Sequence, residues 1–298
     1  MSILLDENTR VIVQGMTGRE GSLRTAFMKG YGTKVVAGVT PGRGGEEVHG
    51  LPVYNTVLEA IKSEGMVDAT VTFIPGPALK SAVYEAIDAG IKFIVSPVER
   101  IPVHDVIAMV NYALKNDAKI LGPGSLGIIS PGRAAMGWLG GSVDWAKKLF
   151  NPGPVGVISR SGGQSGTVPW ALKVAGLGIS TALHIGTEPV LGLTMADVLK
   201  QFETDDQTKA VAIFGEIGGT LEEEAAEAVA NGEFTKPLVV FIAGAWAPEG
   251  MRFSHASSIV ERGRGTAQGK IKALTEAKAY VVDSPEDIAP KIKELINA

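Results

Sequence analysis

The sequence predicts an α/β protein in two parts, each built on a parallel sheet with helices on both faces. Short apolar runs of strand length alternate with longer stretches of helical spacing along the whole chain. A chain of 298 residues, 45% of them hydrophobic, is also long enough for two domains that each bury a core. We therefore expect a domain boundary near the middle.

In the first half, apolar runs and helical stretches follow one another regularly. The predicted strands are residues 10–14, 34–39, 69–73, 92–95 and 119–121. The predicted helices are residues 22–31, 55–64, 77–89 and 103–116, with Asn55 as the cap of the second. Because helices connect consecutive strands, the strands are expected to run parallel.

A second series begins at residue 155. Its predicted strands are residues 155–159, 178–184, 210–214, 238–242 and 279–282, and its predicted helices are residues 168–175, 195–203, 221–230, 267–276 and 285–296. The glycine-rich and proline-containing segment between the two series is typical of a linker. We predict domains over 1–130 and 155–298, joined by a linker over 131–154.

The composition excludes several classes of function. The formal net charge is −4, and lysines and arginines are scattered singly, so neither nucleic acid nor a membrane is an expected partner. The absence of cysteine excludes disulfides, thiolate metal sites and thiol nucleophiles. The four histidines show no metal-ligand spacing, so no metal site is expected. The first residues resemble neither a signal peptide nor a membrane span, which favours a cytoplasmic location.

A glycine-rich turn over residues 15–21 follows the first strand and leads into a helix, where backbone amides can face a pyrophosphate. Its G-x-x-G-x-x-G spacing differs from the dinucleotide fingerprint. The second strand ends without the acidic residue that an NAD site needs. It is followed instead by Arg43, whose cation suits a ribose phosphate, either the 3′-phosphate of CoA or the 2′-phosphate of NADP.

Three features of the second half suit phosphoryl chemistry. His255 lies in a long loop after strand 238–242, at the sheet edge where such folds place their sites. Glu216 ends a strand at the same edge, where its carboxylate can cap the helix that follows. Residues 159–163, Ser-Arg-Ser-Gly-Gly, stand between a strand and a helix, so their amides and hydroxyls can hold an anion.

Several segments resemble the alpha subunits of the succinyl-CoA synthetase family, namely residues 1–4, 15–18, 31–34, 38–42, 50–56, 85–92 and 247–256. The resemblance implies a Rossmann-like CoA-binding domain followed by a flavodoxin-like parallel α/β ligase domain. It places CoA contacts at Thr17, Gly18, Arg19, Glu20, Arg43, Pro97, Val98 and Glu99, although Pro97 has no backbone N–H to donate. It also implies that His255 is phosphorylated, that Glu216 orients it, and that Ser159, Ser161, Gly162 and Gly163 hold the phosphoryl group.

The implied activity is an acid-thiol ligase of the NDP-forming type, in which an acyl phosphate makes the carboxylate reactive toward the CoA thiol. The chain has no G-x-x-x-x-G-K-[ST] motif for binding a nucleotide triphosphate. In the most similar segment, residues 263–271, the first glycine is one position off and Ile271 replaces the serine or threonine whose hydroxyl binds magnesium. The resemblance implies that ATP or GTP with Mg²⁺ binds to an ATP-grasp beta subunit in an αβ or α2β2 assembly.

The chain departs from the family pattern where the resemblance places the organic acid. The altered positions are Gly124, Ser125, Gly166, His184 and Thr187. These changes are expected to enlarge the pocket and alter its hydrogen-bond donors. Succinate is the default acid, with malate, citrate or a sulfonated acid as alternatives. An NADP-dependent oxidoreductase and a non-catalytic CoA-binding regulator are the competing functions.

Overall fold

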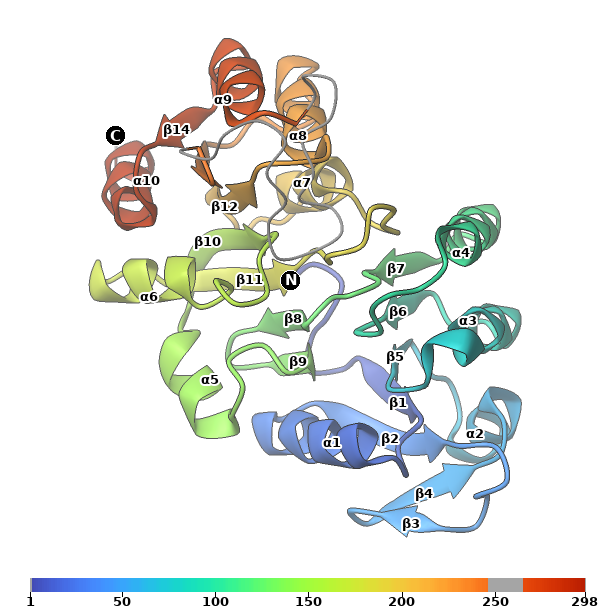
Figure 1. Ribbon diagram of the computed structural model, residues 1–298. Helices are drawn as coiled ribbons and strands as arrows, with labels where there is room; N and C mark the ends of the chain where they lie inside the picture. Colours follow the sequence, from blue (N-terminus) through green and yellow to red (C-terminus); the bar gives the residue numbers. More distant parts are fainter. Residues whose placement is uncertain (1, 246–264, 298) are drawn as a thin grey trace.

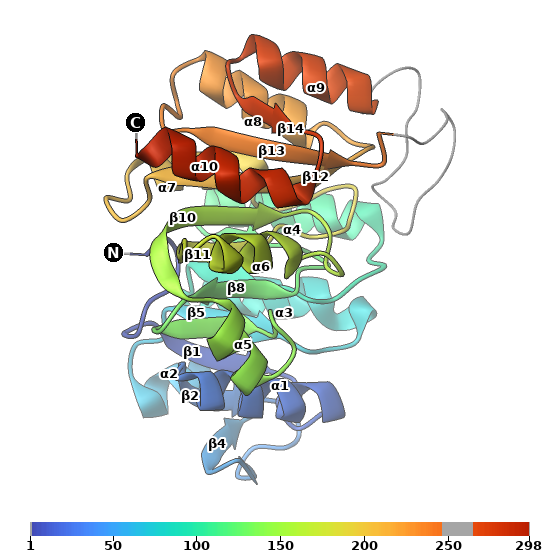
Figure 2. The same cartoon turned by 90° about the vertical axis from the view of Figure 1, so that its left-hand side faces the viewer.

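The computed structural model describes residues 2–245 and 265–297. These residues form two seven-stranded sheets, the first from the N-terminal half of the chain and the second from the C-terminal half. Helices cover both sheets, and the two layered units lie one beyond the other in both views (Figure 1, Figure 2). None of the described helices is both long enough and apolar enough to cross a membrane.

The first sheet has the strand order β3-β4-β2-β1-β5-β6-β7, with every neighbouring pair parallel except β3 and β4. Its strands are β1 (Arg10–Gln14), β2 (Lys34–Val39), β3 (Glu47–Val48), β4 (Leu51–Tyr54), β5 (Ala69–Thr72), β6 (Phe93–Val95) and β7 (Lys119–Leu121). Its helices are α1 (Arg19–Tyr31), α2 (Val57–Glu64), η1 (Gly76–Ala78), α3 (Leu79–Asp88) and α4 (Val103–Lys115).

The second sheet has the order β14-β13-β12-β10-β11-β8-β9, in which β8 and β9 are antiparallel additions to a parallel sheet. Its strands are β8 (Gly127–Ser130), β9 (Ala134–Gly137), β10 (Pro152–Ser159), β11 (Ile179–His184), β12 (Ala210–Glu216), β13 (Leu238–Ala243) and β14 (Tyr280–Val282). Its helices are α5 (Val143–Leu149), α6 (Thr167–Val174), α7 (Met195–Glu203), α8 (Leu221–Ala230), α9 (Ala267–Glu276), η2 (Pro285–Asp287) and α10 (Ile288–Ile296).

Each sheet contains an inner strand that is buried along its whole length. Every residue of β5 and of β11 is buried, because helices cover both faces of each sheet. One continuous apolar cluster extends from Val11 of the first sheet through Met136 of β9 to Val157 of the second. The two sheets therefore share part of their hydrophobic core.

The β8–β9 hairpin joins the two sheets. The Thr33 hydroxyl donates to the Ala135 carbonyl at 2.6 Å and accepts from the Ala135 N–H at 2.9 Å, and the Ser130 hydroxyl donates to the Leu5 carbonyl at 2.6 Å. The segment 131–154, which we predicted to be a linker, contains β9 and α5 and the start of β10. It packs against α1 as part of the shared core.

The predicted fold class is confirmed, and the ten predicted strands correspond to strands of the structure within three residues at each end. Four short strands were not predicted: β3, β4, β8 and β9. The predicted cap of the second helix was wrong by one residue, because the Thr56 hydroxyl accepts from the Glu59 N–H of α2. Asn55 instead binds the glycine-rich turn after β2.

Candidate active site

The first sheet has a hollow at its topological switch point. The chain passes from β1 to β2 on one side and later to β5 on the other, so the loops that leave β1 and β5 diverge at the carboxyl edge. A hollow of about 380 Å³ opens there. It is lined by residues that follow β1, β2 and β5 and by the start of α3, among them Gly15, Thr17, Gly18, Thr40, Phe73, Ile74 and Ser81.

Glycines shape the turn at this hollow. Gly15 has φ +84°, and a Cβ placed there would overlap the Phe73 carbonyl. A Cβ at Gly21 would overlap the Gly15 carbonyl, so the turn can pack this closely against α1 because residue 21 is glycine. Helix α1 begins at Arg19 with no side-chain cap at Gly18. Its first-turn amides therefore supply the partial positive charge that suits a pyrophosphate.

The predicted phosphate-binding arginine lies in a turn that the structure organises in detail. The Asn55 side-chain oxygen accepts from the N–H groups of Gly42 and Gly44 at 2.9 and 3.0 Å. The Arg43 guanidinium forms a two-point ion pair with the exposed Glu46 carboxylate and lowers its pKa through that hydrogen bond. Our sequence reasoning missed Glu46, although its place three residues after Arg43 was a usable signal. A phosphate at Arg43 has to compete with this carboxylate.

The other predicted CoA contacts lie around this hollow to differing extents. Thr17 and Gly18 line it, whereas Glu20 is paired with Arg24 on the exposed side of α1. Pro97, Val98 and Glu99 follow β6, where the Val98 carbonyl accepts from the Gly124 N–H at 2.9 Å. The residues after β5 were missed, although their position at a strand end could have identified them.

The second sheet repeats this arrangement around β10. The chain passes from β10 to β11 on one side and to β12 on the other, so a second switch point lies between β10 and β12. Ser159, at the end of β10, is in register with His184 on β11 and with Phe214 on β12. Glu216 lies two residues beyond Phe214. The predicted phosphate loop and the predicted orienting glutamate therefore flank one crevice.

Arg160 connects these two features and was missed as a site residue by our sequence reasoning. Its side chain is 1% exposed. The guanidinium donates from Nη1 to the Gly218 carbonyl at 2.6 Å and to Glu222 at 3.2 Å, and its Nε lies 3.5 Å from the Glu216 carboxylate. Its backbone N–H donates to the Phe214 carbonyl at 2.9 Å. The loop after β10 is thus fixed to the end of β12 through one buried side chain.

The predicted phosphate loop is partly organised by its own hydroxyls. The Ser159 hydroxyl donates to the Ser161 carbonyl, and the Ser165 hydroxyl donates to the Gly162 carbonyl, both at 2.8 Å. Space around Gly163 is open to 4 Å. Helix α6 begins at Thr167, after three further residues, so the anion-binding capacity rests on the loop amides as well as on the helix end.

His255, the predicted nucleophile, lies outside the described residues. The residues that flank that segment are bonded to the residues directly after β12. The Ala243 carbonyl accepts from the Ile217 N–H at 3.1 Å, and the Gly265 carbonyl accepts from the Gly218 N–H at 2.8 Å. Both flanks are therefore bonded to the two residues that directly follow Glu216.

Four of the five residues predicted for the acid pocket lie together. The Ser125 hydroxyl donates to the His184 carbonyl at 2.5 Å, and Gly124 packs so closely on Thr187 that a Cβ would overlap its hydroxyl. A Cβ at Gly162 would lie 3.5 Å from the His184 ring, which places this group beside the phosphate loop. Gly166 lies apart from it.

The ring of His184 is held in one tautomer. Its Nδ1 accepts from the Leu126 N–H at 2.9 Å, and its Nε2 lies 3.2 Å from the Arg160 carbonyl. Nδ1 must be unprotonated to accept, and Nε2 must carry the proton to donate to a carbonyl. His184 is therefore a buried neutral imidazole that supports the loops on both sides of it.

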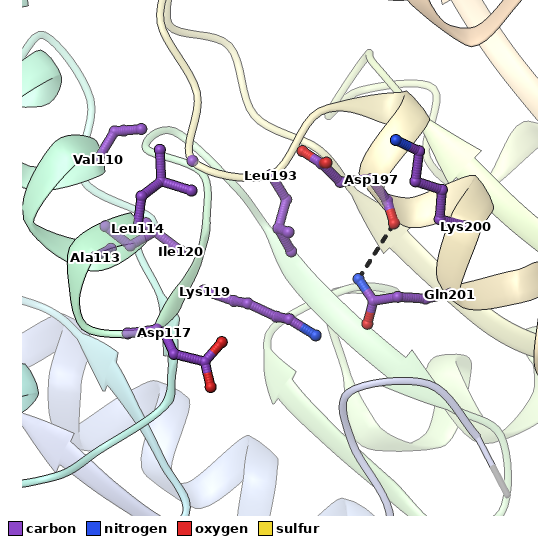
Figure 3. Close-up of a pocket in the computed structure, with 12 residues that line it drawn as sticks. Val110, Ala113, Leu114, Asp117, Lys119, Ile120, Leu193, Asp197, Lys200 and Gln201 are labelled. Carbon is purple, nitrogen blue, oxygen red and sulfur yellow. Dashed lines mark hydrogen bonds between the residues drawn. The ribbon is translucent and has the colours of Figure 1, made fainter. Parts of the chain in front are cut away.

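Two other hollows differ in how close they lie to the predicted phosphate loop. Gly163 of that loop and Gly166 line a hollow of about 680 Å³ together with the stacked, half-exposed rings of Trp145 and Trp170. A hollow of about 230 Å³ lies between Lys119, at the start of β7, and α7 (Figure 3). Its polar groups already serve the fold, because Asp197 completes the capping box of α7 and Lys200 pairs with Glu233.

Loops at the carboxyl edges of the two sheets are bonded to each other. The Arg100 N–H, after β6, donates to the buried Glu188 carboxylate, after β11. The Gly192 N–H donates to the Gly122 carbonyl at 2.9 Å. Both sheets therefore direct their carboxyl edges toward a common region, which suits a ligand that is held by the first sheet and reacts at the second.

Comparison with known proteins agrees with this arrangement. Residues 6–99 match the CoA binding domain family and residues 158–280 match the CoA-ligase family. A CoA-binding unit followed by a CoA-ligase unit defines the class of acid-CoA ligase subunits, and the chain belongs within it to the family of alpha subunits of ADP-forming acid-CoA ligases. The family predicted from the sequence is confirmed.

Individual relatives support this assignment. The chain is 45% identical to the succinate–CoA ligase [ADP-forming] subunit alpha of Aquifex aeolicus, over 99% of this chain and 95% of that one. It is 42% identical to an ADP-forming sulfoacetate-CoA ligase subunit of an Acholeplasma species, over 99% and 98% of the two chains. The ATP citrate lyase of Methanothrix soehngenii, solved with citrate and coenzyme A, aligns with a TM-score of 0.90 and 26% identity; this chain spans 99% of its own length and half of that chain.

Proposed function

We propose that this chain binds CoA at the first switch point and carries a phosphohistidine, His255, at the second, so that the CoA thiol meets an acyl phosphate where the two sheets converge. The observation that carries the proposal is that both sheets have a switch point and that loops at their carboxyl edges are bonded to each other, as at Arg100 and Glu188. An NADP-dependent oxidoreductase and a regulator without catalysis are not favoured, because the relatives are named as ligases.

The proposed reaction has three steps. An imidazole nitrogen of His255 attacks the terminal phosphorus of the nucleotide, and the nucleoside diphosphate leaves. A carboxylate oxygen of the acid then attacks the phosphorus, which releases His255 and forms an acyl phosphate. The CoA thiolate finally attacks the acyl carbon, and inorganic phosphate leaves. Splitting the reaction in this way converts a poor electrophile into a reactive one.

Glu216 and the loop over residues 159–163 have complementary roles in these steps. A glutamate that accepts from one imidazole nitrogen leaves the other free to attack. The bonds of Ile217 and Gly218 to Ala243 and Gly265 support this role, because they bring both flanks of the His255 segment next to Glu216. The amides of Gly162 and Gly163 then hold the phosphoryl oxygens.

We propose succinate as the acid and the group formed by Gly124, Ser125, His184 and Thr187 as its surroundings. A relative named for succinate and a relative named for sulfoacetate are almost equally similar to this chain, at 45% and 42% identity. The acid is therefore set by a few pocket residues. Because His184 is neutral and already bonded at both nitrogens, the carboxylate farther from the reaction centre has to be recognised by hydroxyls and amides.

We further propose that the nucleotide is ATP and that it binds, with Mg²⁺, to an ATP-grasp beta subunit. Lys270, in the segment of this chain closest to a nucleotide-binding motif, is completely buried against Glu222 and Glu223. That lysine has no access to a phosphate.

The nucleophile is tested with the chain purified together with its beta subunit. The complex is incubated with γ-labelled ATP and Mg²⁺, and acid-labile label on this chain is measured. Wild type should be labelled, and His255→Asn should lose the label. The matched control is His104→Asn, which replaces an exposed histidine on α4 and should label normally. Label that survives in His255→Asn assigns the nucleophile to another residue.

The acid is tested by discharge of the labelled complex. Succinate with CoA should remove the label and form succinyl-CoA, and sulfoacetate, malate and citrate should do so at least tenfold more slowly. Faster discharge by one of those three reassigns the substrate. Failure of every acid to discharge the label contradicts the ligase function.

A further inference from the structure

Lys270 has an unusual environment for a lysine. It lies in the first half of α9, its side chain is 0% exposed, and its ammonium contacts the carboxylates of Glu222 and, at 3.0 Å, Glu223. Glu222 is also completely buried. Lysine and glutamate are rarely buried fully unless they are paired, because an isolated charge in the interior is strongly destabilising. This pair therefore persists for a specific structural reason.

The pair is connected to the candidate active site through Glu222. One oxygen of Glu222 accepts from the backbone N–H of Glu216 at 3.1 Å, and the other lies 3.2 Å from Arg160 Nη1. Arg160 in turn contacts the Glu216 carboxylate through Nε at 3.5 Å. Glu216 is thus held by Glu222 at its backbone and by Arg160 at its side chain.

The charges explain why a lysine is needed beside this group. Burial by itself raises the pKa of the Glu222 carboxyl. The charges of Arg160 and Lys270, with the hydrogen bonds from Lys270 and from the Glu216 N–H, outweigh burial and hold that pKa below its usual range. Without Lys270, Arg160 would be the remaining cation beside a fully buried carboxylate, and its guanidinium would be drawn from Glu216 toward Glu222.

We propose that Lys270 is a positioning residue of the phosphoryl-transfer site, which neutralises Glu222 so that Arg160 can hold the Glu216 carboxylate in place. The proposal rests on the function of Glu216 and His255 proposed above. Lys270 touches no reacting atom; it acts through Glu222 and Arg160.

The test compares three variants of the complex with its beta subunit. Lys270→Gln removes the charge and keeps a hydrogen-bond donor, Lys270→Arg keeps the charge, and Lys272→Gln changes a side chain on the same helix that is 75% exposed. The rate of labelling by γ-labelled ATP is measured per folded complex, together with the dissociation constant of CoA.

The expected result is a rate of labelling about 100-fold lower in Lys270→Gln, the size of loss that follows a displacement of about 1 Å at a reacting group. Lys270→Arg should label at least tenfold faster than Lys270→Gln, and Lys272→Gln should label at the wild-type rate. CoA affinity should stay within twofold of wild type in all three, because CoA is held by the other sheet. A lysine that stabilised the fold without positioning Glu216 would lower the yield of folded complex and leave the rate per complex unchanged.

A charge-compensated variant covers the case in which Lys270→Gln does not fold. Lys270→Gln with Glu222→Gln removes both buried charges and leaves Arg160 to Glu216, so this double variant should label within tenfold of the wild-type rate per folded complex. Lys270→Met with Glu222→Gln should match it, because no buried carboxylate remains for residue 270 to neutralise. A loss of more than tenfold in both double variants overturns the proposal. If the wild-type complex takes up no label, the proposed function fails; if wild type and Lys270→Gln label equally fast, only the role of Lys270 fails.

Discussion

Arg160 Nε lies 3.5 Å from Glu216 Oε1, so the arginine that opens the phosphate loop reaches the glutamate at the end of the neighbouring strand. The same guanidinium is bonded to Gly218 and Glu222, and its backbone carbonyl faces the His184 ring. One buried residue thus joins three strand ends, and its loss should affect both stability and chemistry.

Replacing Arg160 by Gln should lower the free energy of unfolding by about 3–5 kcal/mol, because it leaves the buried Glu222 carboxylate with one cation fewer. Unfolding in urea, followed by circular dichroism, measures this loss. Arg133→Gln is the matched control, since Arg133 forms a 3.8 Å ion pair with Glu7 at the surface and should cost at most about 1 kcal/mol. Similar losses in the two variants would show that the Arg160 network is not a buried charge cluster.

Glu222 should make stability depend on pH in the acid range. Its pKa is depressed in the folded state, so its stabilisation is fully present above its unfolded value of about 4.3 and is lost as the pH falls through the folded value. The difference in unfolding free energy between wild type and Glu222→Gln should be constant near neutrality and shrink below about pH 4.3. Glu227→Gln, on the exposed side of α8, should give no such change. A pH-independent difference would contradict the depressed pKa.

Replacing Gly21 by Ala should weaken CoA binding at least tenfold, because the new Cβ would overlap the Gly15 carbonyl and push the turn away from α1. Isothermal titration with CoA measures the effect. Leu23→Ala, at an exposed position of the same helix, should bind CoA as wild type does. Unchanged affinity in Gly21→Ala would place the pyrophosphate elsewhere.

Arg43 and Glu46 should have opposite effects on CoA affinity. Arg43→Met should weaken binding about tenfold, the worth of one charge-assisted hydrogen bond to a phosphate. Glu46→Gln should strengthen it, because it removes the competing carboxylate. Titration with 3′-dephospho-CoA provides the control, since neither substitution should change its affinity. An equal loss for CoA and dephospho-CoA in Arg43→Met would show that Arg43 does not read the 3′-phosphate.

The local signals in the sequence were sufficient for the framework of both sheets. Strands such as β6 and β13 are apolar along their whole length because helices cover both faces of the sheet, and this pattern is visible in the chain itself. The glycines at 15 and 21 and the strand-end positions of Glu216 and Ser159 were visible because they are set by residues that are neighbours along the chain. Strand β3 has two residues, too few to show a period, and β9 lies in the glycine-containing segment that we predicted to be a linker, so both were missed.

Sequence alone therefore determined the fold class, the family and the two glycine-rich loops, because these depend on periodicity and on residues that are neighbours along the chain. Tertiary structure decided the roles of Arg160, Lys270 and His184. A charged or titratable side chain has the same local signature whether it is solvated or buried, and its partners lie on distant strands and helices. Burial and charge pairing are properties of the folded chain, so Lys270 became a candidate positioning residue only when α9 was packed against α8.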